Sequence, residues 1–198
     1  MPDHYYSKAP ESAHRPLEFR ATVLGHDLVF ETDAGVFSRD GLDKGTELLL
    51  HALPSISGHV LDLGCGWGAV GVSLAKAYPG AHVTMVDINS RAVELSQKNA
   101  LKNGVQVHAL QSDGFEALQD IFFSLIVTNP PIRAGKQVIY SLFEQSARHL
   151  MPGGSLFIVI RKQQGAPSAL SFLDTIYDKV QVVEKGGGFW VIRADTKA

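Results

Sequence analysis

The sequence predicts an α/β fold: a mostly parallel sheet of seven strands with helices on both faces. Three observations support this. Apolar runs of strand length alternate with amphipathic stretches of helical length from residue 59 onward. Turn residues end the helical stretches at Pro79-Gly80, Asn103-Gly104 and Pro152-Gly153-Gly154. The last two strand-like runs flank a turn at 186–188, which predicts a closing hairpin with one antiparallel strand.

The bounds of the elements follow from the same patterns. Parallel strands are expected at 59–64, 82–88, 105–111, 123–129 and 155–160, helices at 68–78, 90–102, 135–150 and 166–177, and the closing hairpin at 180–183 and 189–192. Upstream, the alternating runs 17–24 and 27–32 around Gly25-His26 predict a β-hairpin, and 44–51 predicts a helix. We therefore expect an N-terminal β-hairpin appendage, residues 1–34, and a Rossmann-like domain, residues 35–198.

Composition limits the possible functions. With 198 residues and 45% apolar content, one substantial core is expected. The 18 basic and 20 acidic residues leave a net charge of −2, so any contact with RNA must be a local patch. The single cysteine excludes an internal disulfide, and no apolar run reaches membrane-spanning length. The N-terminus lacks a secretory pattern, which predicts a cytoplasmic protein, and the eight histidines show no metal-ligand spacing, which predicts no metal site.

A glycine-rich turn, 64–68, joins the first strand of this domain to its first helix. Glycines at 64, 66 and 68 allow the backbone to approach a ligand beside a helix N-terminus, as in nucleotide-binding turns. The spacing also fits a loose dinucleotide fingerprint. Asp62, two residues before the first glycine, is unusual for an NAD site. Asp87 ends the second strand, where an acid can accept both ribose hydroxyls of either NAD or S-adenosylmethionine. Cys65 fills a position that needs a small residue. No general base is evident beside it, so we do not expect it to act as a nucleophile.

The carboxyl ends of four strands carry residues suited to ligand binding. In an open parallel sheet, ligands bind at these ends, where the strand order reverses. Asp113 is open to two interpretations, a helix cap or a contact to an adenine amino group. The four segments are Asp62 to Gly68, Asp87-Ile88, Ser112-Asp113-Gly114 and Asn129-Pro130-Pro131-Ile132.

Together these strand ends resemble the motifs of class I S-adenosylmethionine-dependent methyltransferases. The tetrapeptide 129–132 resembles the N-P-P-x signature of enzymes that methylate amino or amide nitrogens, which implies a catalytic role for Asn129, Pro130, Pro131 and Ile132. An exocyclic amine is a poor nucleophile because its lone pair is delocalised into the ring. Hydrogen bonds from the amine to the Asn129 side-chain oxygen and the Pro130 carbonyl would orient it, and the two prolines would hold that carbonyl rigid.

A closer resemblance lies upstream. The segment 35–43, Gly-Val-Phe-Ser-Arg-Asp-Gly-Leu-Asp, is similar to the entry into the catalytic domain of RsmC-type small-subunit ribosomal RNA guanine-N2 methyltransferases, and the resemblance extends over about 27–162. It implies that 35–198 is a class I methyltransferase domain. It also implies a cofactor site for S-adenosylmethionine made of Phe37, Thr46, Asp62, Gly64, Cys65, Gly66, Gly68, Asp87, Ile88, Asp113, Gly114 and Asn129.

The chain departs from that family at two points. Ile132 stands where many relatives place an aromatic to stack on the target base, so stacking is expected from Phe37 or from Tyr5-Tyr6. Longer members carry a second domain for which this chain has no room. Basic residues after strand ends predict instead an RNA-binding rim of Arg133, Lys136, Arg161 and Lys162, with Lys185 nearby.

The sequence therefore predicts methyl transfer from S-adenosylmethionine to an exocyclic amine, guanine N2 in small-subunit ribosomal RNA. Two alternatives within the same chemistry are a protein glutamine amide, to which Thr46-Glu47 is similar, and adenine N6. An alternative of another class is a cofactor-binding or RNA-binding module without catalysis, against which Asn129 argues.

Overall fold

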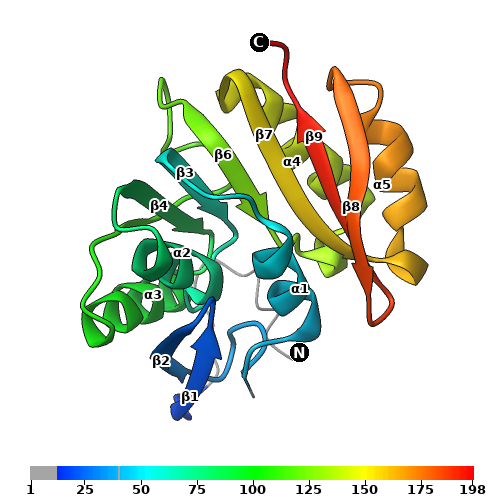
Figure 1. Ribbon diagram of the computed structural model, residues 1–198. Helices are drawn as coiled ribbons and strands as arrows, with labels where there is room; N and C mark the ends of the chain where they lie inside the picture. The colour runs from blue at the N-terminus through cyan, green and yellow to red at the C-terminus, as the bar shows by residue number, and fades with distance from the viewer. Residues whose placement is uncertain (1–12, 40) are drawn as a thin grey trace.

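A computed structural model describes residues 13–39 and 41–198. The expected hairpin is followed by a seven-stranded sheet and its helices (Figure 1). In chain order the elements are β1 (Leu17–Val23), β2 (His26–Thr32), α1 (Lys44–Ala52), β3 (Gly58–Leu63), α2 (Ala69–Ala77), β4 (Ala81–Asp87), α3 (Ser90–Lys102), β5 (His108–Gln111), β6 (Phe123–Thr128), η1 (Ile132–Ala134), α4 (Lys136–His149), β7 (Leu150–Arg161), η2 (Lys162–Gln164), α5 (Ala166–Leu173), β8 (Lys179–Gly186) and β9 (Phe189–Asp195).

The large sheet has the strand order β5-β4-β3-β6-β7-β9-β8. All neighbours from β5 to β7 are parallel, and β9 lies antiparallel between β7 and β8. The chain first builds outward from β3 to β5 and then returns to the other side of β3 with β6. The strand order thus reverses between β3 and β6, where the Thr128 hydroxyl donates to the Leu63 carbonyl at 2.7 Å. Ligands of open parallel sheets bind at such a reversal. These features confirm the predicted fold class.

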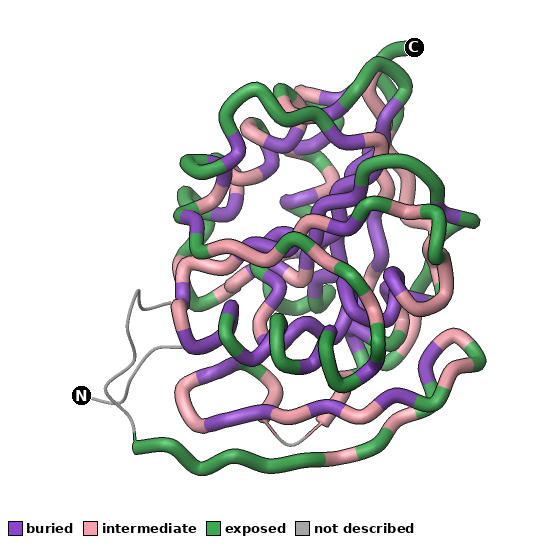
Figure 2. Tube along the Cα trace, turned by 90° about the vertical axis from the view of Figure 1, so that its left-hand side faces the viewer, coloured by how far each residue is buried: buried purple, intermediate pink, exposed green. Residues whose placement is uncertain are grey.

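Both faces of the sheet are buried because successive residues of its strands point to opposite sides. Val60 packs with α1, α2 and α3, whereas the next residue, Leu61, packs with α4 and α5. The same division separates Phe157 from Ile158 on β7. Figure 2 shows the buried residues concentrated inside the molecule and the exposed ones along its outer turns. Among the described helices, none is long and apolar enough to cross a membrane.

Two asparagine side chains attach the N-terminal hairpin to α3, because their amides bond to the backbone N–H and C=O groups of β2 as a neighbouring strand would. Asn99 accepts the backbone N–H of Glu31 at 2.7 Å and donates to the carbonyls of Glu31 and Trp67. One helical turn later, Asn103 accepts from Val29 at 2.9 Å and donates back to its carbonyl. The open edge of β2 is therefore paired rather than exposed to other chains.

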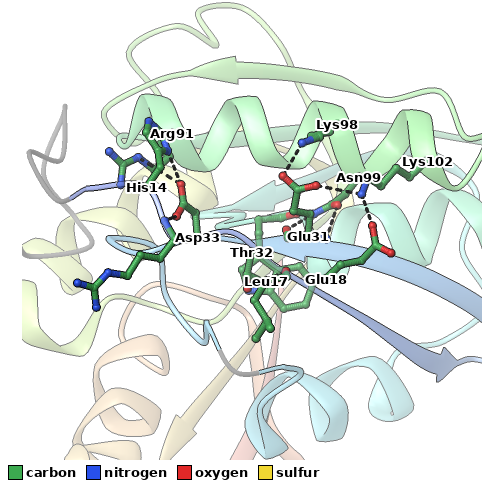
Figure 3. A network of polar contacts seen from close by, with 12 residues as sticks. His14, Leu17, Glu18, Glu31, Thr32, Asp33, Arg91, Lys98, Asn99 and Lys102 are labelled. Carbon is green, nitrogen blue, oxygen red and sulfur yellow. Dashed lines mark hydrogen bonds and ion pairs between the residues drawn. The ribbon is translucent and has the colours of Figure 1, made fainter.

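Charged groups reinforce this contact between β2 and α3 (Figure 3). Glu31 pairs with both Lys98 and Lys102, and Lys102 also reaches Glu18 on β1. The bond from Lys98, with that from Lys102, outweighs partial burial and holds the pKa of Glu31 below its usual value. The hairpin also contributes to the main core, because the buried ring of Phe30 meets Trp67 edge to face at 4.9 Å between centroids. The division at residue 34 stays a prediction.

Some predicted bounds were wrong, each for a local reason. The strand expected at 105–111 begins only at His108, because Val105 donates to the Ala100 carbonyl and completes the end of α3. The helix expected to reach 150 ends at His149, and β7 starts at Leu150, with the 152–154 segment inside the strand.

The C-terminal part differs in a similar way. The helix expected at 166–177 ends at Leu173, and Tyr177 turns inward to donate to the Phe143 carbonyl at 2.9 Å. The closing strands are longer than expected, and their turn is made by Gly187 and Gly188. Gly153, which has a φ of 72°, donates its N–H to the Lys197 carbonyl at 2.8 Å, so the C-terminus pairs with this first part of β7.

Candidate active site

A cavity of about 350 Å³ opens at the carboxyl ends of β3, β4 and β6, where the strand order reverses. Its walls come from the glycine turn, the segment before α1, the ends of β4 and β5, and α4. The lining residues are Val36, Phe37, Ser38, Asp43, Thr46, Asp62, Leu63, Gly64, Cys65, Gly66, Trp67, Ala69, Val70, Val86, Asp87, Ile88, Ala92, Ser112, Asp113, Gly114, Asn129, Pro130, Pro131, Ala134, Val138 and Leu142.

The glycines of the turn serve two different purposes. Gly64 and Gly66 have φ of 76° and 55°, and a Cβ at either would enter open space, although both line the cavity. Their bare backbone thus forms a cradle that a ligand can approach closely. Gly68 is different, because a Cβ there would lie 3.0 Å from that of Ser96, and it is not part of the cavity wall. The structure places Gly68 where α2 packs on α3.

Asp62 is buried at the end of β3, with 2% of its surface exposed. Its Oδ2 accepts the N–H of Gly71 at 2.8 Å and so caps α2, whose own N-cap, Gly68, has no side chain to do this. Burial raises the pKa of Asp62 to about 7, with the negative charge of Asp87 adding to the effect and the Gly71 bond opposing it. A cationic ligand group in the cavity would stabilise the charged carboxylate.

Asp87 connects the glycine turn to the end of β4. One carboxylate oxygen accepts from Gly66 at 2.8 Å and the other from Asn89 at 2.9 Å. Burial raises the pKa of Asp87, and these backbone bonds offset part of the rise. A carboxylate oxygen has more than one acceptor position, so both oxygens keep capacity for ligand hydroxyls. Asp87 therefore both shapes the turn and faces the cavity.

The predicted cofactor residues Cys65, Ile88, Asp113 and Gly114 also line the cavity. Ile88 is fixed through its carbonyl, which accepts from Gln111 at 2.8 Å. Asp113 is exposed beside Gly114, and no helix begins there in the described chain, so its side chain is not a helix cap. Burial and the nearby carboxylates raise the pKa of the Cys65 thiol well above its usual value, which makes it a poor nucleophile.

Asn129 is placed at the cavity wall by the end of β6, and its amide is fixed by a residue distant in sequence. Its Nδ2 donates to the Thr46 hydroxyl at 3.1 Å. Thr46, 4% exposed, donates in turn to Oδ2 of Asp43, while Oδ1 of Asp43 accepts the N–H groups of Gly45 and Thr46 and caps α1. Thr46 and Asn129, which were predicted separately as cofactor residues, are thus in direct contact.

The other residues of the N-P-P-x segment and Phe37 do not share one orientation. Pro130 and Pro131 line the cavity. Ile132 does not; it packs on the core beneath α4 and α5 and so is turned away from the expected stacking position. Phe37 is 40% exposed at the wall, whereas Tyr5 and Tyr6 lie outside the described residues.

The four predicted RNA-binding side chains are exposed outside the cavity. Arg133 and Lys136 follow β6, Arg161 ends β7 and Lys162 comes directly after it, so all four lie with the cavity at the carboxyl ends of the parallel strands. Arg161 lies over the ring of Phe189 at 4.4 Å, which holds its guanidinium at this edge. In the described residues, no three His, Cys, Asp or Glu side chains converge on a metal position.

Sequence reasoning missed several wall residues. Asp43 is the most informative, because an Asp three residues before Thr46 at a helix start is a recognisable capping pattern. Val138 and Leu142 are one turn apart on α4 and could have been read from helical spacing. Ser38, Ser112 and Trp67 lie inside segments that the sequence singled out, but nothing in the sequence marked them individually as wall residues.

The fold and the cavity together define a class I methyltransferase. The strand order, the open glycine cradle and two acidic strand ends are the elements such a domain uses to hold its cofactor, S-adenosylmethionine. The chain belongs to the methyltransferase small-domain family, whose sequence model matches residues 27–193. The class and its cofactor predicted from the strand-end motifs are confirmed.

Individual relatives extend this result. YbxB of Bacillus subtilis, an uncharacterized protein, is 43% identical over 198 residues, with 98% of each chain covered. Ribosomal RNA small subunit methyltransferase C of Aeromonas hydrophila is 39% identical over 79% of this chain and 46% of its own length. The structure of the T. thermophilus 16S rRNA N2-guanine methyltransferase RsmC, solved with AdoMet and guanosine, has a TM-score of 0.85 and 31% identity over 95% of this chain and 52% of that one. The chain thus spans about half the length of the RsmC proteins it matches.

Proposed function

We propose that this protein transfers a methyl group from S-adenosylmethionine to the exocyclic N2 of guanine in small-subunit ribosomal RNA. One observation carries the proposal: the Asn129 amide, fixed at its nitrogen by Thr46, lies on the wall of a cavity that also contains the glycine cradle and Asp87. The similarity to RsmC, solved with AdoMet and guanosine, supports it.

The cofactor fits the chemistry of this wall. The open backbone at Gly64 and Gly66 would accept its amino acid part, and Asp87 its ribose. Asp62, whose pKa is raised to about 7, would be stabilised by a nearby cationic group of the cofactor. When bound, S-adenosylmethionine supplies an electrophilic methyl group. We assign the adenine side to Ile88, Asp113 and Gly114, which line the adjoining wall.

The chain's own residues act on the acceptor. Asn129 Oδ1 would accept one N–H of the amine, and the Pro130 carbonyl would accept the other. These two bonds would orient the nitrogen lone pair before the reaction. Hydrogen bonds that these oxygens accept from N–H groups strengthen as the nitrogen becomes positive, so they stabilise the transition state more than the ground state. The amine gains the methyl group as the S–CH₃ bond breaks, and it loses one proton to water. Phe37, at the mouth of the cavity, offers a ring for stacking on the base in place of Ile132.

The decisive experiment supplies methyl-labelled S-adenosylmethionine with naked 16S rRNA, assembled small subunits, or a glutamine-containing release factor. We expect label in RNA and, after nuclease digestion, N2-methylguanosine by mass spectrometry. Label in N6-methyladenosine or in the protein would replace guanine by one of the alternative acceptors. Cofactor binding without label in any acceptor would favour a non-catalytic module.

A further inference from the structure

The side chains of Asp43, Thr46 and Asn129 form a directed chain of hydrogen bonds from the start of α1 to the cavity wall. Its bond between Thr46 and Asn129 joins residues 83 positions apart, and all three residues line the cavity. From it we infer that Asp43 is a positioning residue: it sets the direction of these bonds so that Asn129 presents its oxygen, not its amide nitrogen, to the acceptor. This inference rests on the proposed function.

The direction follows from the donors available. An ionised aspartate has acceptors only, and the Thr46 hydroxyl has a single proton. Because that proton goes to Asp43 Oδ2, Thr46 can only accept a bond from Asn129. The carboxamide of Asn129 must therefore turn its NH₂ toward Thr46. The opposite amide orientation would put two lone-pair atoms, Oγ1 and Oδ1, against each other.

The same carboxylate is fixed in place by the helix. Its other oxygen accepts the backbone N–H groups of Gly45 at 2.9 Å and Thr46 at 3.2 Å, so the positive end of α1 holds Asp43. Close packing limits movement of the helix start, since a Cβ at Gly45 would lie 2.8 Å from the ring of Phe189. The chain of bonds is thus built into a rigid part of the fold.

The consequence is selectivity by hydrogen-bond direction. An acceptor oxygen on the wall favours a substrate group that donates N–H, such as an exocyclic amine, and repels a ring carbonyl placed at the same point. If the amide were reversed, its NH₂ would favour the carbonyl instead. Asp43 would in this way help the site choose between the amino and the keto groups of a base without touching either.

Asp43→Asn is the sharpest test, because asparagine is an equally good helix cap but can donate to Thr46. That donation frees the Thr46 proton to point at Asn129. The Asn129 amide then no longer has to turn its NH₂ toward Thr46. We expect the single-turnover methylation rate to fall on the order of 10-fold or more, with the Kd for S-adenosylmethionine and the KM for RNA within about twofold of wild type. Thr46→Val should have a similar effect, and Thr46→Ser should restore most of the rate.

Glu47→Gln is the matched control, since it removes one negative charge from the same exposed helix turn without a bond to Thr46. Its rate should equal wild type. In the Thr46→Val background, Asp43→Asn should cost no further rate, because the connection is already broken. Wild-type rates in both Asp43→Asn and Thr46→Val, with the fold verified, would overturn the inference.

A readout without RNA separates this inference from the proposed function. In the free protein, the side-chain NH₂ signals of ¹⁵N-labelled Asn129 should show slowed proton exchange that both variants lose. Equal exchange in wild type and variants overturns the directed chain of bonds even if RNA is methylated. Slowed exchange lost in the variants, in a protein that methylates no RNA, supports the chain of bonds and overturns the proposed function instead.

Discussion

Asparagine side chains hold both the hairpin contact and the cavity, but they are used differently. At α3, Asn99 is bonded at both ends of its amide, to Glu31 and to the Trp67 carbonyl. At the cavity, the nitrogen of the Asn129 amide is fixed by its bond to Thr46, and Asn129 forms part of the cavity wall. The first arrangement satisfies two stretches of backbone, whereas the second fixes an orientation and presents an oxygen.

The difference shows how one residue type serves stability or chemistry. A buried amide bonded at both ends contributes to folding because its removal leaves backbone groups unpaired. An amide held at one end contributes little to folding and is available for a ligand. The two regions should therefore respond oppositely to the same substitution.

Asn129→Ala should give the largest effect. We expect the single-turnover methylation rate to fall on the order of 10²-fold or more, because one preorganised contact to the reacting amine is lost. Unfolding by urea should change little, since only the bond to Thr46 is removed. Asn129→Asp keeps acceptors, so partial activity there would support the acceptor role. Full activity in the folded alanine variant would remove Asn129 from the chemistry.

Asn99→Ala should do the reverse. The free energy of unfolding should fall by about 2 kcal/mol, because the N–H and C=O of Glu31 and the carbonyl of Trp67 lose their partner. The methylation rate of the folded fraction should stay near wild type. Gln97→Ala, on the exposed side of α3, is the control and should cost less than about 0.5 kcal/mol. A lower rate without lost stability would contradict the comparison.

Asp62→Asn should separate stability from binding within the cavity itself. Asp62 has a pKa of about 7 in the folded protein against about 3.9 unfolded, so it binds a proton more readily when folded. Its contribution to stability is present below about pH 4 and is lost as the pH rises to about 7. Asparagine keeps the acceptor for Gly71 without the charge.

The apo variant should therefore exceed wild type in stability by about 1 kcal/mol or more at pH 8, but not at pH 4. Urea titrations at both values measure this, and calorimetry should show weaker binding of S-adenosylmethionine. Asp113→Asn is the control, because it removes one negative charge from an exposed position of the same cavity. A parallel pH dependence in wild type and Asp62→Asn would exclude Asp62 as its source.

The smallest effect is expected from the basic residues at the carboxyl ends of the parallel strands. Changing Arg133, Lys136, Arg161 and Lys162 to alanine should weaken RNA binding several-fold at moderate salt and reduce its salt dependence, because phosphate contacts release counterions. Cofactor affinity should stay the same. The control removes exposed charges from the opposite edge, Arg148, Lys179 and Lys197. An equal loss per charge in both sets would show a general charge effect and no RNA-binding rim.

The sequence by itself determined the features that depend on neighbouring residues. Alternating periodicity gave the order of strands and helices, and the glycines at 64 and 66 indicated the ligand cradle because their conformational freedom is a local property. Asp62, Asp87 and Asn129 could be placed together in advance, since parallel strands bring their carboxyl ends to one edge.

Only the tertiary structure decided which partners these residues meet. Asn129 bonds to Thr46 across 83 residues, and Asn99 to Glu31 across 68, and neither pairing has a signal in local spacing. Packing also placed the partly buried Ile132 against the core and away from the cavity wall, and it placed Gly68 at the contact between α2 and α3 rather than at the ligand cavity. These choices depend on how distant surfaces fit, because the direction of a side chain is set by the volume left around it and by the donors it can reach.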